Sequence, residues 1–338
     1  MVLAPLACIS VQTLQLGRSG PTISRIGLGC MGMSDFYGSA DEVESSATIH
    51  AALDVGITLL DTGDFYGMGH NEMLLGQALR QRARGSFLLS VKFGALRTPE
   101  GSFSGIDCRP QAVRNFAAYS LKRLGTDYID IYRPARLDPN VPIEETVGAI
   151  ADLIRAGRVR YLGLSEAGAE TLRRAHAVHP VVDLQIEYSL MSRGIEAGLL
   201  QSARELGVAI TAYGVLSRGL LSGTLPVQGL TGLRTHMPRF QGENYRRNLQ
   251  LVDALSAIAR RKGVMPSQLA IAWVLSRGED IVPLIGTKSR ARLAEAVAAL
   301  GMRLSEAELA ELETAVPAAS VAGTRYAAEQ MAHLDSER

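Results

Sequence analysis

Three residues of this sequence could together carry out acid–base chemistry. Asp61 ends one short apolar run, Lys92 lies inside another, and Tyr66 follows Asp61 by five residues in a loop bounded by glycines. A lysine in an apolar strand is costly to bury unless a carboxylate pairs with it, and Asp61 is the natural partner. An ammonium group beside Tyr66 is expected to lower the pKa of its phenol from ~10 and so make it a general acid. The alternative is a structural Asp–Lys pair beside a surface tyrosine, and we favour the site because all three residues are predicted to share one rim.

A second group of residues could bind a phosphate and an aromatic ring. The stretch Pro283–Arg292 follows an apolar run, leads into a predicted helix and carries Lys288 and Arg292. A helix N-terminus with two cations suits a phosphate monoester, although basic residues at helix starts are often only solvated. Tyr213, at the end of another apolar run, offers a flat face on which a ring could stack.

The run Gly27–Gly32 fits the spacing of the dinucleotide fingerprint G-x-G-x-x-G. That fingerprint requires a helix to open within the motif, whereas here Met33–Asp41 intervenes with no apolar period. We therefore predict a tight turn, with a close approach of the backbone, and no Rossmann site.

The candidate catalytic and phosphate-binding residues can form one site only in a fold that brings the ends of several strands together. Eight short apolar runs alternate with amphipathic helical patterns, which is typical of buried parallel strands and predicts a single closed (β/α)8 barrel. A doubly wound sheet is the alternative, but the chain shows no composition break between two halves. The predicted strands are Arg25–Gly29, Thr58–Asp61, Phe87–Phe93, Tyr128–Tyr132, Tyr161–Ser165, Asp183–Tyr188, Val208–Tyr213 and Ile281–Ile285.

Two additions to the plain barrel are expected. Val11–Leu16 and Thr22–Ile26 predict a hairpin that could cover the bottom of the barrel. The long connection Gly214–Asp280, between strands seven and eight, predicts two helices and a functional loop. Residues 1–338 are predicted to form one domain, with a disordered lead over 1–10 and a C-terminal helix and tail over 302–338, where Ser305 to Glu308 form a capping box.

Composition excludes several classes of protein. The chain has 338 residues, of which 47% are hydrophobic, and 35 Lys and Arg against 34 Asp and Glu give a net charge of +1. This leaves no basic field for nucleic acid or anionic membrane, and no apolar run approaches the ~18 residues of a membrane helix. Three cysteines match neither a disulfide framework nor a zinc pattern, so we expect reduced thiols, no metal and a cytoplasmic location.

The sequence resembles the aldo-keto reductases from about Leu14 to Gly301, and within them the broad bacterial, fungal and plant branch that acts on diverse aldehydes and ketones. The resemblance implies a (β/α)8 barrel that binds NADP(H) without a Rossmann fold and reduces a small carbonyl substrate. It rests on the segments Gly27–Ser34, Leu60–Gly67 with His70–Glu72, Ser90–Lys92, Gly163–Glu166, Leu184–Ser189, Ala212–Gly223 and Gly286–Lys288.

The resemblance also implies roles for individual residues. Asp61, Tyr66 and Lys92 match three members of the family's catalytic tetrad, with Tyr66 as proton donor. The implied cofactor site has Ser165 and Gln185 on the carboxamide, Tyr213 as the stacking ring, and a pyrophosphate strap. The full set of implied cofactor residues is Gly29, Met31, Ser165, Gln185, Tyr213, Leu216, Ser217, Arg218, Gly219, Gly286, Lys288 and Arg292.

The fourth tetrad member, a histidine, is missing, because Ala135 stands at its position. Glu166 and Ala296 replace asparagines that are common in the family. Alternation along an extended segment puts Arg133 on the same side as Ala135, so that Arg133 either faces the substrate oxygen or points to solvent or to Glu166. Phe65, Arg133 and Ala135 are therefore the expected substrate pocket.

Three functions are compatible with these residues. The first is an NADPH-dependent reductase of aldehydes or ketones. The second is an NADP(H)-binding regulatory protein with weak turnover, since the resembled family includes channel β subunits. The third, a lyase that uses Lys92 as a Schiff-base amine, requires an unpaired Lys92 and so conflicts with the expected Asp61 partner.

Overall fold

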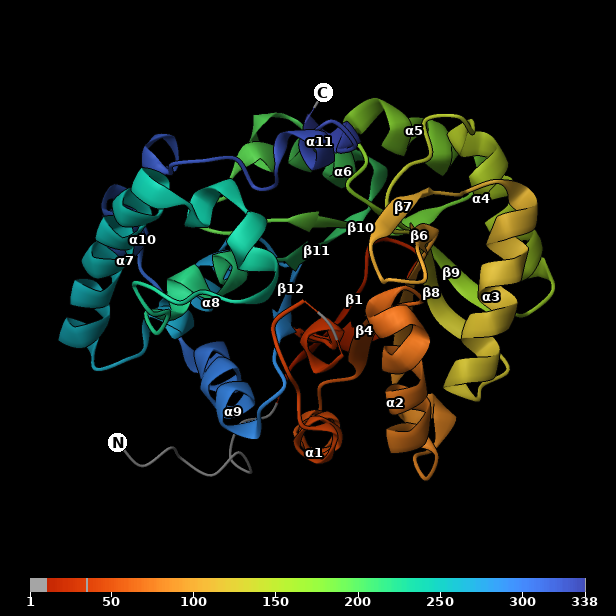
Figure 1. Ribbon diagram of the computed structural model, residues 1–338, viewed down its shortest axis with the longest axis horizontal. Helices are drawn as coiled ribbons and strands as arrows, with labels where there is room; N and C mark the ends of the chain where they lie inside the picture. Colours follow the sequence, from red (N-terminus) through yellow and green to blue (C-terminus); the bar gives the residue numbers. More distant parts are fainter. Residues whose placement is uncertain (1–10, 35, 338) are drawn as a thin grey trace.

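The computed structural model describes residues 11–34 and 36–337, so the predicted lead 1–10 lies outside the described residues. Eight parallel strands close into a barrel in the spatial order β10-β11-β12-β3-β4-β5-β8-β9 (Figure 1). This confirms the predicted fold, and each strand overlaps its predicted run. The strands are β3 (Gly27–Gly29), β4 (Leu59–Gly63), β5 (Leu88–Phe93), β8 (Ile129–Pro134), β9 (Val159–Ser165), β10 (Val181–Glu187), β11 (Ala209–Tyr213) and β12 (Ile281–Gly286).

Helices surround the barrel because each buries one apolar stripe against the strands. In α4 the buried stripe includes Ile143, Val147 and Ile150, at the predicted helical spacing. Proline begins α3 at its first turn and Gly125, with φ of 65°, ends it. The barrel helices are α1 (Glu42–Asp54), α2 (His70–Leu79), α3 (Pro110–Leu124), α4 (Ile143–Arg155), α5 (Ala169–Val178), α6 (Leu199–Leu206), α8 (Pro266–Ser276) and α9 (Arg290–Ala298).

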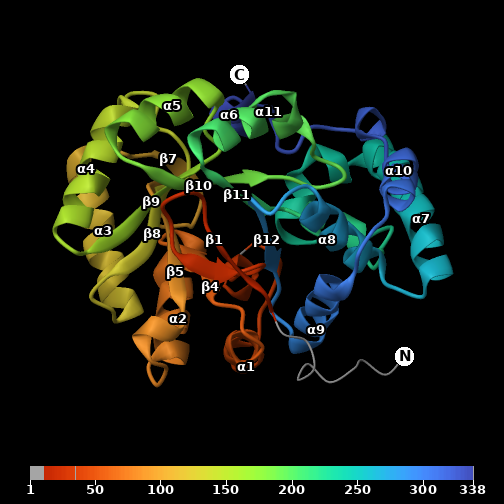
Figure 2. The ribbon, with the colours of Figure 1, turned by 180° about the vertical axis from the view of Figure 1, so that it is seen from behind.

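The predicted N-terminal hairpin is present as the antiparallel pair β1 (Thr13–Gln15) and β2 (Thr22–Ser24). Its Leu16 and Ile23 form a cluster with the early strand residues Leu59, Val182 and Ala209, so the hairpin closes the bottom of the barrel. Figure 2, seen from behind, shows this red segment against the strands. The opposite end of the barrel, at the carboxyl ends of the strands, remains open for an active site.

The connection between β11 and β12 has the predicted two helices, α7 (Gly242–Lys262) and α8. Three short 3₁₀ helices precede them, η6 (Ser217–Ser222), η7 (Gly232–His236) and η8 (Pro238–Phe240). A second hairpin, β6 (Ala95–Arg97) with β7 (Phe103–Ile106), follows β5 and had no counterpart in the sequence prediction. The remaining 3₁₀ helices are η2 (Met31–Met33), η3 (Tyr66–Gly69), η4 (Arg84–Ser86), η5 (Gly194–Ala197) and η9 (Ala299–Gly301).

The C-terminal segment crosses from one side of the molecule to the other. α10 (Glu306–Ala315) opens with the predicted capping box at Ser305 and packs beside α7. The chain then passes η10 (Ala318–Ser320) and reaches α11 (Ala328–Met331) and η11 (Asp335–Glu337), near α5 and α6 (Figure 1). A hydrogen bond of 2.7 Å from Gly168 N to Asp335 Oδ2 ties this end to the start of α5. The tail therefore spans the rim where the strands end.

No helix in residues 11–34 and 36–337 is long and apolar enough to cross a membrane. Within the same described residues no cluster of three or more His, Cys, Asp or Glu side chains could hold a metal ion.

Candidate active site

Strand register brings the predicted catalytic residues to one rim. Asp61 of β4 pairs with Ser90 of β5, and Lys92 pairs with Gly63 on one side and with Arg133 of β8 on the other. These positions lie at or near the carboxyl ends of three neighbouring strands, where barrel chemistry occurs.

Asp61 is the centre of a buried polar network. Lys92 Nζ forms an ion pair with its Oδ1, as the sequence predicts, and Ser90 Oγ donates to its Oδ2 at 2.8 Å. Gln185 Nε2 also donates to Oδ2, at 2.7 Å. Both members of the ion pair are buried, which explains how a lysine is tolerated inside an apolar strand. The Gln185 side chain, which the resemblance implies would hold a cofactor carboxamide, thus uses its amide nitrogen to donate a hydrogen bond to Asp61.

Tyr66 begins η3 directly after β4 and is 6% exposed. Its ring packs at 4.7 Å from the ring of Phe65, and Lys92 Nζ lies 5.2 Å from its ring centroid. Burial raises the pKa of Tyr66 well above its usual value, and the negative charge of Asp61 raises it further. The predicted lowering of this pKa by Lys92 is therefore wrong, because desolvation dominates and because Asp61 neutralises the ammonium group. The charges that do favour phenolate belong to Arg136 and Arg218.

Arg133 occupies neither of its two predicted positions. Its guanidinium is fully buried inside the barrel, where Nη1 pairs with Asp183 Oδ2 at 2.9 Å and Nη2 donates to Ser90 Oγ at 3.0 Å. Gly163 makes room for this pair, since a Cβ there would lie 2.6 Å from Asp183 Oδ1 and 3.1 Å from Arg133 Cζ. Arg133 is thus a core residue neutralised by Asp183, and it is not free to bind substrate.

The segment after β8 brings a different arginine to the rim. Ala135 N donates to Phe93 O at 2.8 Å, which holds the segment beside the end of β5. Ala135 itself is buried. Arg136 Nη1 donates to Ala135 O at 2.7 Å and Nη2 to the Tyr326 hydroxyl at 3.4 Å. Sequence reasoning missed Arg136, because alternation along the strand pointed to Arg133.

Phe65 belongs to an aromatic wall around Tyr66. Its ring lies 6.0 Å from that of Phe103, which stands on the unpredicted hairpin β6–β7. Phe103 in turn stacks on Phe36 at 6.1 Å, and Phe36 contacts Tyr66 edge-on at 6.1 Å. Three apolar rings from three loops therefore border the candidate proton donor.

The implied cofactor residues also lie along the carboxyl ends of the strands. Gly29 and Met31 end or follow β3, Ser165 ends β9, Tyr213 ends β11 and Gly286 ends β12. Of the implied strap Leu216–Gly219, Leu216 precedes η6 and the other three residues lie in it. Ser217, Arg218 and Gly219 have φ of 47°, 58° and 96°. Two adjacent non-glycine residues in the left-handed region are uncommon, and such strain gathers at functional sites.

The two implied phosphate cations are bound to protein groups in this structure. Lys288 Nζ donates to Tyr37 O at 3.3 Å, in the loop after η2. Arg292 Nη1 pairs with Glu295 at 3.0 Å and Nη2 donates to Thr224 Oγ1 at 3.3 Å. Both lie beside the start of α9, where a phosphate would exchange for these contacts.

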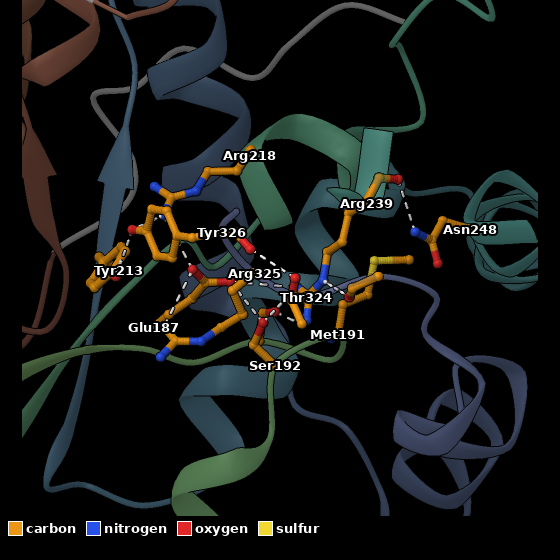
Figure 3. A network of polar contacts seen from close by, with 12 residues as sticks. Glu187, Met191, Ser192, Tyr213, Arg218, Arg239, Asn248, Thr324, Arg325 and Tyr326 are labelled. Carbon is orange, nitrogen blue, oxygen red and sulfur yellow. Dashed lines mark hydrogen bonds and ion pairs between the residues drawn. The ribbon is translucent and has the colours of Figure 1, made fainter. Parts of the chain in front are cut away.

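Glu166 follows β9 with φ of 53° and holds the C-terminal segment (Figure 3 shows the neighbouring network). Arg325 binds it through two hydrogen bonds of 3.0 and 2.9 Å, and Ser336 Oγ donates at 2.6 Å. Burial alone would raise the pKa of Glu166, but the hydrogen bonds and charge of Arg325 outweigh it and lower that pKa to about 2. The glutamate that departs from the family pattern thus serves as an anchor for the tail.

Tyr326 is held over the site by this anchor. Its hydroxyl meets the Tyr213 hydroxyl at 2.9 Å and accepts a hydrogen bond from Arg218, which also pairs with Glu187 at 3.2 Å (Figure 3). The Arg218 guanidinium lies 5.1 Å from the centroid of the Tyr213 ring, the ring implied to stack on a cofactor. Sequence reasoning missed Arg325 and Tyr326, although a glutamate at position 166 signals that a cation must approach it.

A profile of the aldo/keto reductase family matches residues 25–317. A protein named "Probable aldo-keto reductase 1" of Glycine max is 41% identical over 322 residues, covering 94% of this chain and 92% of its own length. The chain belongs to the aldo/keto reductase family.

Solved structures agree with this family membership. The glycerol dehydrogenase of Gluconobacter oxydans is 28% identical with a TM-score of 0.81, covering 90% of this chain and 96% of its own. An aldo-keto reductase of Bacillus halodurans, solved in a holo form, is 27% identical with a TM-score of 0.76, covering 91% of this chain and 97% of its own. Both relatives therefore span nearly the whole barrel of this family member.

Aldo/keto reductases generally use a nicotinamide dinucleotide, and two observations fit such a group here. A Cβ on Gly286 would meet nothing within 4 Å, so the rim is open at this glycine, whereas a Cβ on Gly29 would already lie 3.4 Å from Gly286 Cα. Arg218 Nε, in the implied strap, is buried and has no hydrogen-bond partner within the described part of the chain. A polar ligand at the strap would satisfy it.

The Arg325–Glu166 pair leads to a prediction about stability. Glu166 has a folded pKa of about 2, below its ordinary ~4.3, so its contribution to the free energy of unfolding is present above pH ~4.3 and is lost as the pH falls through 2. Arg325→Gln is expected to cost on the order of 3 kcal/mol at pH 7, and this difference should shrink between pH ~4 and ~2. Denaturant titrations across this range measure it, with Arg246→Gln in the exposed pair with Glu243 as control. A difference from wild type that does not change with pH would contradict the assignment.

Proposed function

We propose that this family member reduces an aldehyde or ketone to an alcohol with NADPH, using Tyr66 as the proton donor. The observation that carries the proposal is the buried set of Asp61, Lys92 and Tyr66 at the ends of β4 and β5. When bound, the cofactor would supply the hydride that attacks the carbonyl carbon. The protein's own residues must then hold the substrate and deliver the proton.

The surroundings of Tyr66 suit a proton donor. Its raised pKa keeps the phenol protonated at neutral pH but makes it a weaker acid, so charges that favour the phenolate must assist the transfer as an alkoxide develops on the substrate. Lys92 and Asp61 neutralise each other and fix the floor of the site. Arg136 and Arg218 favour the phenolate left behind after transfer. These two arginines thus oppose the energetic cost of burying that charge.

Cofactor choice is proposed to depend on Lys288 and Arg292. Each can make a charge-assisted hydrogen bond to a 2′-phosphate, worth roughly 1.5–3 kcal/mol. NADPH is therefore expected to bind at least about tenfold more tightly than NADH. The double variant Lys288→Ala/Arg292→Ala should remove most of this preference while leaving the Kd for NADH nearly unchanged. Fluorescence titration of both cofactors measures it, and equal affinities in the unmodified protein would contradict the assignment.

One observation favours a second candidate, an NADP(H)-binding regulatory protein. The tail holds Tyr326 over a site whose Tyr66 is almost inaccessible, and Ala135 stands at the position implied for histidine. NADPH oxidation with a panel of aldehydes, ketones, quinones and dicarbonyls separates the two functions. Turnover supports the reductase, whereas tight cofactor binding without turnover on any of them supports the regulatory protein.

A further inference from the structure

Arg136 stands at the rim beside the candidate catalytic residues. It lies three residues after Arg133, which is in register with Lys92, and the Ala135–Phe93 hydrogen bond of 2.8 Å fixes the intervening backbone against β5. Its guanidinium donates to two neutral groups, the Ala135 carbonyl and the Tyr326 hydroxyl, and lies 5.6 Å from the Tyr326 ring centroid. None of these contacts compensates its charge.

The other arginines near the rim are paired with carboxylates. Arg218 pairs with Glu187 at 3.2 Å and Arg239 reaches Glu187 at 3.5 Å (Figure 3). Arg325 pairs with Glu166 at 2.9 Å. Arg136 has no carboxylate within ion-pair distance among residues 11–34 and 36–337. The charge of Glu166 acts on Arg136 without forming an ion pair with it. A guanidinium that is largely withdrawn from water without a paired anion is costly, and a ligand that brings an anion into contact would compensate it.

Tyr326 is a neutral group in the place where such an anion would lie. Because Tyr213 donates its hydroxyl proton to Glu166 Oε1 at 2.7 Å, Tyr326 must be the donor in the Tyr326–Tyr213 contact. The oxygen of Tyr326 is then left to accept from both Arg136 and Arg218. The Arg136 contact is long, at 3.4 Å, and a carboxylate oxygen would form a shorter and stronger bond.

We propose that Arg136 is a specificity-determining residue that binds a carboxylate bonded directly to the reacting carbonyl carbon, so that the preferred substrates are 2-oxo acids. The aromatic wall of Phe36, Phe65 and Phe103 suits an aryl group on the other side of that carbonyl. The role assigned by alternation to Arg133 thus belongs to the next arginine along the chain, the half-buried Arg136. This inference rests on the proposed function, since it names the substrate class of the same site.

The test compares two substrates that differ only in charge, phenylglyoxylate and its methyl ester. Wild type is expected to show kcat/KM for the acid at least about tenfold above that for the ester. Arg136→Gln should lower the value for the acid at least about tenfold and the value for the ester by less than about threefold, and Arg136→Lys should be intermediate because it keeps charge without the planar fork. Arg114→Gln, in an exposed pair with Asp152, is the matched control and should change neither. An equal loss for both substrates, or no preference for the acid in wild type, overturns the inference.

A binding measurement separates this inference from the proposed function. Oxamate carries a carboxylate beside an amide carbonyl, and calorimetric titration of the purified protein should show its affinity falling about tenfold in Arg136→Gln. If the ester is reduced but oxamate binds both forms equally, the reductase stands and the anion site is refuted. If neither carbonyl compound is reduced while oxamate still requires Arg136, the anion site stands and the proposed function fails. Should Arg136→Gln not fold, as judged by circular dichroism, the Arg136→Lys comparison decides.

Discussion

Replacing Tyr66 with phenylalanine is expected to lower kcat for carbonyl reduction by about 10²–10⁴-fold, the usual contribution of a general acid. The phenol delivers its proton only as the alkoxide develops, so the loss should fall on kcat and leave cofactor affinity unchanged. The ring can keep its contacts with Phe65 and Phe36, because phenylalanine removes only the hydroxyl. Stopped-flow single-turnover kinetics with NADPH, together with a cofactor titration, measure both quantities.

A matched control for this variant is Tyr119→Phe. Tyr119 lies on α3 and is 57% exposed, so removal of its hydroxyl should change neither kcat nor the cofactor Kd. If Tyr66→Phe turned over like wild type, another group would have to supply the proton. The hydroxyl of Tyr326 would be the first to examine, because it lies on the same rim.

Arg133→Met is expected to destabilise the fold by about 3–5 kcal/mol, the cost of leaving one member of a buried ion pair without its partner. Asp183 would then keep Thr211 Oγ1 as a donor but lose the guanidinium that neutralises it. Both side chains are fully buried, so the remaining carboxylate would stay withdrawn from solvent. Denaturant unfolding followed by circular dichroism measures the loss.

The double variant Arg133→Met/Asp183→Leu provides the decisive comparison. Replacing both partners with apolar groups should recover most of the loss, because no unpaired charge remains. Arg114→Met, in the exposed pair with Asp152, should cost less than about 1 kcal/mol. If Arg133→Met were as mild as Arg114→Met, or if the double variant were the less stable of the two, the pair would not be the structural element described here.

Local pattern was enough to predict the elements of this fold. Short continuous apolar runs place all eight barrel strands and period-3.6 repeats place most of the helices, because the strands are buried on both faces and each helix buries one apolar stripe. The ion pair between Lys92 and Asp61 was predictable for a similar reason, since a lysine in an apolar strand demands a carboxylate near its end. The hairpin β6–β7 was missed, because its strands have only three and four residues and because β7 is largely exposed.

The partners of the polar side chains could not be predicted from spacing. Alternation along β8 could not show that Arg133 pairs inside the barrel with Asp183, which lies fifty residues later in the chain. The direction of a pKa shift also depends on how deeply the group is buried. Burial and the charge of Asp61 raise the pKa of Tyr66, whereas a nearby lysine alone would lower it. The partner of Arg133 and the pKa of Tyr66 both depend on contacts between residues that are far apart in the sequence.

Sequence alone was therefore sufficient for the barrel, its bottom hairpin and the rim to which Asp61, Tyr66 and Lys92 belong, because these follow from burial repeated along the chain. Only the folded chain shows that Arg325 and Tyr326 close over that rim, since Glu166 and Arg325 are separated by 159 residues and meet through the tail's path across the molecule. Within the described residues, the same closure leaves Arg136 without an ion-pair partner. Periodicity records which face of an element is buried, whereas the pairing of charges depends on where distant elements come together in space.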